Sequence, residues 1–202
     1  MNEQLERRLS GAVQAEVRAE GDAQKRVLTG HAALFESPYD VGNIAKWGFR
    51  EVIAPGAFAA ALAEQQDVRA LWNHDESAVL GRTRSGTLKL AEDARGLAVE
   101  IALPDTQIGR DLGELVRRGD VSQMSFGFVV REETWGTVDG VDVRRITRAD
   151  LFDVSPVTYP ANANTDIALR GATARALEER QRAADVGASR MRTRRLVLLG
   201  LE

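Results

Sequence analysis

The sequence predicts an α+β fold in which a closed or strongly curved, mostly antiparallel sheet is packed with a few helices. Short alternating apolar runs follow one another closely between residues 13 and 103, divided by Gly, Asp and Ser, which is typical of strands joined by tight turns. Two segments, at residues 55–62 and 105–118, carry apolar side chains at helical spacing instead. With 202 residues, of which 44% are hydrophobic, the chain is long enough for one domain with a real core.

The first half of the chain predicts a hairpin, a short helix and four further strands. VQAEVRA and RVLTGHAALF are separated by the turn-like residues 20–22, so residues 13–35 form the hairpin. FREVIAPGAFAAAL, at residues 49–62, is a short strand that leads into a helix, because Pro55 suits the first helical turn. The strand-like runs that follow are DVRALWNH, SAVLGRT, GTLKLAED and RGLAVEIAL.

The second half predicts one helix followed by three strands. Asp105 can cap the first free amide groups of the helix, and Gly119 ends it. The apolar stripe of this helix consists of Ile108, Leu112, Leu115 and Val116. MSFGFVVREETW then turns back through Asp139-Gly140 into VDVRRITRA, since this dipeptide readily adopts the positive φ angles of a tight hairpin. The last strand of the core is LFDVSPVTY, and residues 161–165 form a loop.

Composition divides the chain into an N-terminal extension at residues 1–12, one domain at 13–170 and a C-terminal tail at 171–202. The start, MNEQLERRLS, has no apolar stretch behind it, so we expect neither a secretory signal nor a membrane partner. The tail is rich in Ala, Arg and Glu, which predicts an exposed Arg-rich helix before the apolar end LVLLGLE. It is either a solvated helix or a docking segment.

Charge and composition exclude several functions. A net charge of -3 and an aromatic content of 5% argue against a nucleic-acid partner. The absence of cysteine removes disulfides, thiolate metal sites and thiol nucleophiles. The two histidines lack the spacing of a zinc motif and no Gly-rich phosphate loop is present, so we expect no metal and no cofactor. Serine, threonine and carboxylate chemistry remain.

A hydroxyl lies among apolar residues in DVSQMSFGFVV. Strand alternation places Ser125 and Gly127 on one face and the large residues Met124, Phe126 and Phe128 on the other. Gly127 leaves space beside the hydroxyl, which would let a substrate backbone approach it. The alternative is a serine that simply faces solvent.

His74 is the candidate base for this serine. It lies in LWNHDE, where a strand-like run meets a polar loop, a position from which a side chain can be held rigidly and still reach a substrate. Imidazole is mostly neutral at pH 7 and can accept the proton of a serine hydroxyl. The other histidine, His31, lies inside an alternating strand, where it could equally face water.

A carboxylate that orients the imidazole would complete a catalytic triad. Asp153 is the first choice, because it is enclosed by apolar residues in LFDVSPV and a carboxylate there is costly without a partner. Asp150 and Asp75 are alternatives that are easier to explain as surface acids.

Four strings in one order resemble the prohead maturation proteases of tailed bacteriophages: FREVIAPGAF, LWNHD, DTQIGRDLGELVRRGDVSQMSFGF and LFDVSPVTYPAN. The resemblance covers residues 29–164. It implies a serine endopeptidase with a fold similar to the herpesvirus assemblins, a curved β-barrel-like sheet with helices packed around it. It also implies action in the host bacterial cytoplasm, inside the assembling procapsid. There the substrates would be scaffold or the scaffolding region of the major capsid protein, and the enzyme would also cut itself.

The resemblance also implies roles for individual residues. The family's histidine falls on His74 in WNHD and its nucleophile on Ser125 in MSFGF. The third position, usually Glu in an EVS-like strand, is Asp153 here, whereas the herpesvirus relatives use a second histidine that His31 does not match. Relatives associate, so we expect a homo-oligomer. The alternative function is an inactive structural or scaffolding homologue, because Asp replaces the usual Glu.

Overall fold

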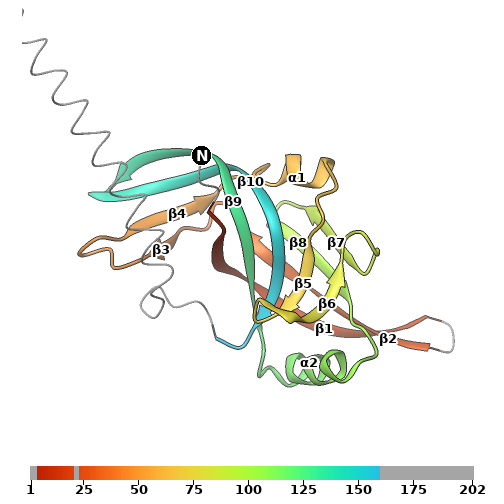
Figure 1. Cartoon of the computed structure of the whole chain (residues 1–202). Helices are drawn as coiled ribbons and strands as arrows, with labels where there is room; N and C mark the ends of the chain where they lie inside the picture. The colour runs from red at the N-terminus through yellow and green to blue at the C-terminus, as the bar shows by residue number, and fades with distance from the viewer. Residues whose placement is uncertain (1–3, 21–22, 160–202) are drawn as a thin grey trace, which may run out of the picture. The chain divides into compact units, whose positions relative to one another are not determined.

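The computed structural model describes residues 4–20 and 23–159, and these form mostly strands with few helices, as predicted (Figure 1). The elements are β1 (Glu6–Glu20), β2 (Ala23–Leu34), β3 (Tyr39–Val41), β4 (Phe49–Ile53), α1 (Ala59–Ala63), β5 (Arg69–Trp72), β6 (Asp75–Arg82), β7 (Leu88–Glu92), β8 (Gly96–Ala102), α2 (Gln107–Arg118), β9 (Gln123–Val138) and β10 (Val141–Val157). None of the described helices is long and apolar enough to cross a membrane. The predicted loop at 161–165 and tail at 171–202 lie outside the described residues.

The strands follow the order β3-β4-β10-β9-β1-β2-β8-β7, and β5 branches off to pair with β10 and β6. Among the described strands, every pairing of one strand with another is antiparallel except those of β4 and β5 with β10, which confirms a mostly antiparallel sheet. The terminal strands β3 and β7 do not pair with each other, so the described sheet does not close into a barrel. Of the two predicted alternatives, a closed or a strongly curved sheet, the closed one is therefore wrong, since a barrel requires hydrogen bonding between its end strands.

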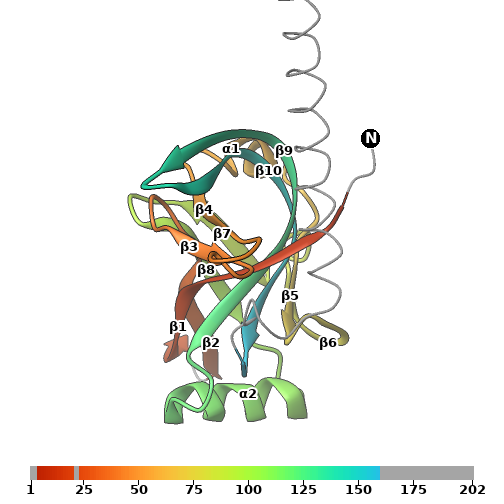
Figure 2. The same cartoon turned by 90° about the vertical axis from the view of Figure 1, so that its left-hand side faces the viewer.

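The longest pairing joins β9 and β10, which run side by side as one bent hairpin (Figure 2). Asp139 and Gly140 connect them with φ angles of 50° and 76°, as expected for a two-residue turn with positive φ at both positions. β10 is one continuous strand, although the sequence suggested two. β1 likewise runs without a break through residues 12 and 13, where the sequence suggested the start of the domain.

Both predicted helices begin later than expected. Helix α1 starts at Ala59 because Gly56 adopts a φ of 83°, outside the helical region. In α2 the N-cap is Thr106, whose side chain accepts a hydrogen bond from the Gly109 amide, whereas Asp105 pairs with Arg110 instead. Of the predicted stripe of α2, Leu112 and Val116 are buried, and Ile108 and Leu115 are partly buried.

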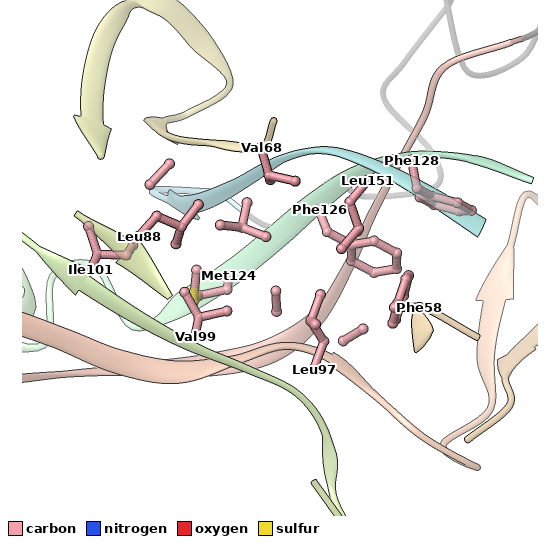
Figure 3. Packing of buried hydrophobic residues seen from close by; sticks show 14 of the residues in the cluster. Phe58, Val68, Leu88, Leu97, Val99, Ile101, Met124, Phe126, Phe128 and Leu151 are labelled. Carbon is pink, nitrogen blue, oxygen red and sulfur yellow. The ribbon is translucent and has the colours of Figure 1, made fainter. Parts of the chain in front are cut away.

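The hydrophobic core lies on the face of β9 and β10 that carries the large side chains. Met124, Phe126 and Phe128 are fully buried there, and Phe126 packs edge-on against Phe58 (Figure 3). Leu97, from β8, packs in the same cluster. The opposite face of β9 is thereby left for polar side chains.

A buried ion cluster joins β1 to β3, β4 and β10. Glu51 is fully buried and accepts hydrogen bonds from Arg8 Nε at 2.7 Å, Arg144 Nη1 at 3.0 Å and the Tyr39 hydroxyl at 2.6 Å. Glu6 accepts from both arginines. Burial opposes the ionisation of Glu6, but the charges and hydrogen bonds of Arg8 and Arg144 outweigh it and lower the pKa of this carboxyl. The cluster fixes the first residues of β1 to the rest of the sheet.

Candidate active site

The register between β9 and β10 brings four small or polar residues together on one face. Ser125 lies opposite Ser155, and Gly127 lies opposite Asp153. Cross-strand partners point their side chains to the same side of a sheet. The predicted alternation of β9 is therefore present, and β10 contributes its own polar residues to the same face.

A β-bulge at Phe152 places Asp153 on this face. Leu151 pairs with Phe128 and Asp153 pairs with Gly127, so Phe152 has no opposite residue. With a regular register and no bulge, Phe152 would lie opposite Gly127 and Asp153 opposite Phe126. The carboxylate would then point into the core, because a shift of one residue exchanges the two faces of a strand. Phe152 is 46% exposed. The bulge thus keeps a charge out of the core and directs it toward the serine.

His74 is carried by the turn between β5 and β6. Asn73 and His74 have φ angles of 55° and 58°, and such left-handed values are more common for Asn and His than for most other residues. β5 pairs in parallel with β10 at Asp153, which brings this turn to the polar face. Asn73 then fixes the turn to the end of β10. The backbone N–H of Asn73 donates to the Pro156 carbonyl at 3.0 Å, and its side-chain oxygen accepts from the Thr158 backbone N–H at 2.8 Å.

The sequence patterns did not single out Asn73. The signal that could have identified it is the tolerance of asparagine for left-handed backbone conformations, directly before the candidate histidine in a sharp turn.

The imidazole of His74 bridges the hydroxyl and the carboxylate. His74 Nε2 lies 2.7 Å from Ser125 Oγ, and Nδ1 lies 2.5 Å from Asp153 Oδ2. An ionised carboxylate only accepts hydrogen bonds, so the Nδ1 proton is donated to Asp153 and Nε2 is left to accept the proton of Ser125. The side chains of His74 and Asp153 are 12% and 7% exposed, and Ser125 is 1% exposed. These charges and dipoles therefore act in surroundings with little water, where electrostatic interactions are strong.

The carboxylate of Asp153 has further neighbours on the same face. Ser155 Oγ donates to Oδ2 at 2.7 Å. Oδ1 occupies the space left by Gly127, since a Cβ atom on this glycine would lie only 2.3 Å from it. A Leu5 methyl group lies 3.7 Å from the same position. The prediction that a substrate backbone would use the space at Gly127 was therefore wrong, because the carboxylate fills it.

The alternative carboxylates have other partners. Asp75 is exposed and accepts hydrogen bonds from the backbone and side chain of Ser77, at 2.8 Å and 2.6 Å. Asp150 accepts from Arg131 Nε at 2.6 Å. Asp75 is thus a surface acid and Asp150 is a partly buried ion-pair partner, whereas Asp153 contacts the histidine.

His31 lies outside this site. Its Nε2 pairs with Asp93 Oδ2 at 2.8 Å, in an exposed interaction between β2 and the loop after β7. Within residues 4–20 and 23–159, no group of three or more His, Asp or Glu side chains is arranged to hold a metal ion.

Comparison with known proteins identifies a family for the chain and a solved structure of similar fold. The family model of the caudovirus prohead serine proteases matches residues 13–182. Among solved structures, the capsid assembly protease of bacteriophage T4 is similar with a TM-score of 0.51 and 12% sequence identity, over 79% of this chain and 100% of the T4 chain. At this identity the likeness concerns the fold alone. No curated protein matches the sequence.

Proposed function

The chain belongs to the caudovirus prohead serine protease family, and on that premise we propose that it is a capsid-maturing endopeptidase with Ser125 as nucleophile, His74 as general base and Asp153 as the third triad residue. The observation that carries the proposal is the single imidazole that contacts the serine hydroxyl through Nε2 and the carboxylate through Nδ1. A serine hydroxyl is a weak nucleophile until a base removes its proton, and this arrangement supplies both the base and the group that orients it.

Acylation begins when Ser125 Oγ attacks the carbonyl carbon of the scissile peptide bond and its proton passes to His74 Nε2. The resulting imidazolium is stabilised by the adjacent Asp153 carboxylate. As the tetrahedral intermediate collapses, the carbon–nitrogen bond breaks and Nε2 returns the proton to the leaving amine. The N-terminal part of the substrate remains on Ser125 as an ester.

Deacylation repeats the same proton transfers with water. The oxygen of a water molecule attacks the ester carbon while Nε2 accepts a proton from that water. The proton then passes to Ser125 Oγ as the ester bond breaks. The free carboxylic acid leaves, and the hydroxyl and the neutral imidazole are regenerated.

The shorter carboxylate at the third position does not favour the inactive homologue. Asp153 lies opposite a glycine and comes within 2.5 Å of His74 Nδ1, although aspartate has one methylene fewer than the usual glutamate. The absence of a side chain at position 127 leaves space for this carboxylate, which supports an active enzyme.

We propose that the substrates are scaffold or the scaffolding region of the major capsid protein, cleaved inside the assembling procapsid in the host cytoplasm, and that the enzyme also cuts itself. Family membership supports this substrate class, as does the fold likeness to a phage capsid assembly protease. Association into a homo-oligomer is part of the same proposal.

We also propose that residues 1–12 extend a protease domain at 13–170 and that the tail at 171–202 docks the enzyme to the shell. The Arg-rich composition and apolar end of the tail support docking. A chain that lacks residues 171–202 should enter shells less often while it still cleaves peptides in solution. Unchanged packaging would contradict the docking role.

The test of the proposed function is co-expression with the cognate major capsid protein, followed by intact mass measurement of both proteins. The capsid protein should be shortened with the wild type and with Ser122→Ala, an exposed serine three residues away. It should remain full length with Ser125→Ala. Full-length capsid protein in shells that contain folded wild-type enzyme would instead indicate the inactive homologue.

A further inference from the structure

A second hydroxyl lies beside the carboxylate of the proposed triad. Ser155 is fully buried on β10, two residues beyond Asp153 on the same strand face. Its Oγ lies 2.7 Å from Asp153 Oδ2, the same oxygen that contacts His74 Nδ1. Two donors therefore converge on one carboxylate oxygen in surroundings that are almost closed to water.

This convergence determines how the carboxylate is oriented. An aspartate side chain can rotate about its last torsion angle, which is broad and weakly restrained. Here Oδ1 is placed over Gly127, and Oδ2 is held by hydrogen bonds from both His74 and Ser155. If the Ser155 hydroxyl were removed, Oδ2 would keep only its bond to the imidazole, so the carboxylate could rotate.

We infer that Ser155 is a positioning residue, which acts through Asp153 to hold the carboxylate in line with His74 Nδ1. The inference rests on the proposed function, since it assigns Ser155 a role in the same triad. Catalytic groups must be held to within about 0.5 Å of their productive geometry, and a misplacement of about 1 Å costs about 100-fold in rate. Loss of the hydroxyl should therefore slow the attack by Ser125 about 10- to 100-fold and leave substrate binding unchanged.

The chain contains a matched control for this hydroxyl. Ser77 Oγ donates to Asp75 Oδ1 at 2.6 Å, also two residues back along a strand, but at an exposed position outside the triad. Ser77→Ala removes the same kind of hydrogen bond from the same kind of partner.

The experiment measures the rate at which a fluorophosphonate probe labels the full chain, with mass spectrometry to locate the adduct. The saturation rate should fall about 10- to 100-fold in Ser155→Ala without a change in the half-saturating probe concentration. The labelling rate of Ser155→Thr, which keeps the hydroxyl, should be within a few-fold of the wild-type rate. The labelling rate of Ser77→Ala should equal the wild-type rate. In the same variants, the downfield proton resonance of His74 Nδ1–H should shift in Ser155→Ala alone.

Two results would overturn the inference. One is labelling of Ser155→Ala at the wild-type rate. The other is equally slow labelling of Ser155→Ala and Ser155→Thr, since the volume of the residue rather than its hydroxyl would then matter. A folded wild-type protein that the probe does not label would instead contradict the proposed function itself, and the role of Ser155 would fall with it.

Discussion

Gly127→Ala should disable the enzyme by displacing the carboxylate of Asp153, a residue that the substitution leaves unchanged. The new Cβ atom would lie 2.3 Å from Asp153 Oδ1, whereas ordinary contacts begin at 3.4 Å. The obstacle is the side chain of a buried, hydrogen-bonded residue, so it must move by about 1 Å for the methyl group to fit. A movement of this size is enough to break the 2.5 Å contact between Asp153 Oδ2 and His74 Nδ1.

The expected loss of activity follows from that displacement. A shift of about 1 Å in a catalytic constellation costs about 100-fold, and loss of the carboxylate's function in a serine triad costs about 10,000-fold in kcat. We therefore expect Gly127→Ala to reduce kcat by a factor between these two values. Overpacking destabilises a protein by about 1–3 kcal/mol, which most domains tolerate, so the variant should still fold.

The assay compares Gly127→Ala with Gly136→Ala, a control on the same strand. A Cβ atom at Gly136 meets nothing within 4 Å, so this variant should label with a fluorophosphonate at the wild-type rate. Circular dichroism and urea unfolding establish that both variants are folded. If Gly127→Ala were folded and labelled as fast as the control, the claim that the carboxylate needs this space would be refuted.

The buried ion cluster gives three further predictions. Glu51→Gln should lower the free energy of unfolding by about 3–5 kcal/mol in urea titrations, because it leaves Arg8 and Arg144 without their shared buried carboxylate. Glu6, whose folded-state pKa is lowered, contributes stability that is present above its ordinary pKa of 4.5 and lost as the pH falls through the lowered value. Glu6→Gln should therefore flatten the pH dependence of unfolding below pH 4.5. Burial and the charge of Glu51 raise the pKa of Tyr39 well above 10.0, so Tyr39→Phe should leave the phenolate absorbance change up to pH 10 unaltered.

An exposed carboxylate of β9 serves as the control for the first two variants. Glu132 pairs with Arg148 only at 3.6 Å and is 64% exposed at its side chain, so Glu132→Gln should leave stability nearly unchanged. If Glu51→Gln and Glu132→Gln lowered the free energy of unfolding equally, the cluster would not stabilise β1. The same conclusion would follow if the free energy of unfolding depended on pH in Glu6→Gln as it does in the wild type. A smaller phenolate signal below pH 10 in Tyr39→Phe would contradict the burial of that hydroxyl in the cluster.

Local patterns in the sequence predicted much of the fold and the polar face of β9. Strand alternation depends only on neighbouring residues, which is why the sequence alone assigns Ser125 and Gly127 to the face opposite Phe126. The turn at Asp139-Gly140 was predictable for the same reason. The end of α2 at Gly119 was also predicted from local sequence, but its N-cap is Thr106 and not the predicted Asp105, because the two residues are adjacent and both suit an N-cap.

Features that depend on distant pairing could not be predicted. Simple alternation in LFDVSPV places Leu151 and Asp153 on one face, and only the bulge at Phe152 separates the buried leucine from the carboxylate. The Asp153 carboxylate fills the space beside Gly127 only because of the register between β9 and β10. The burial of Arg8 and Arg144 depends on β1, β4 and β10 meeting in space, and sequence spacing carries no sign of it.

The identity of the nucleophile is tested most directly by peptide mapping of the purified full-length protein after reaction with a fluorophosphonate. The account predicts one adduct, on Ser125, that is lost in Ser125→Ala and in His74→Ala although both variants remain folded. An adduct on another residue, or labelling that persists in His74→Ala at the wild-type rate, would contradict the triad of Ser125, His74 and Asp153.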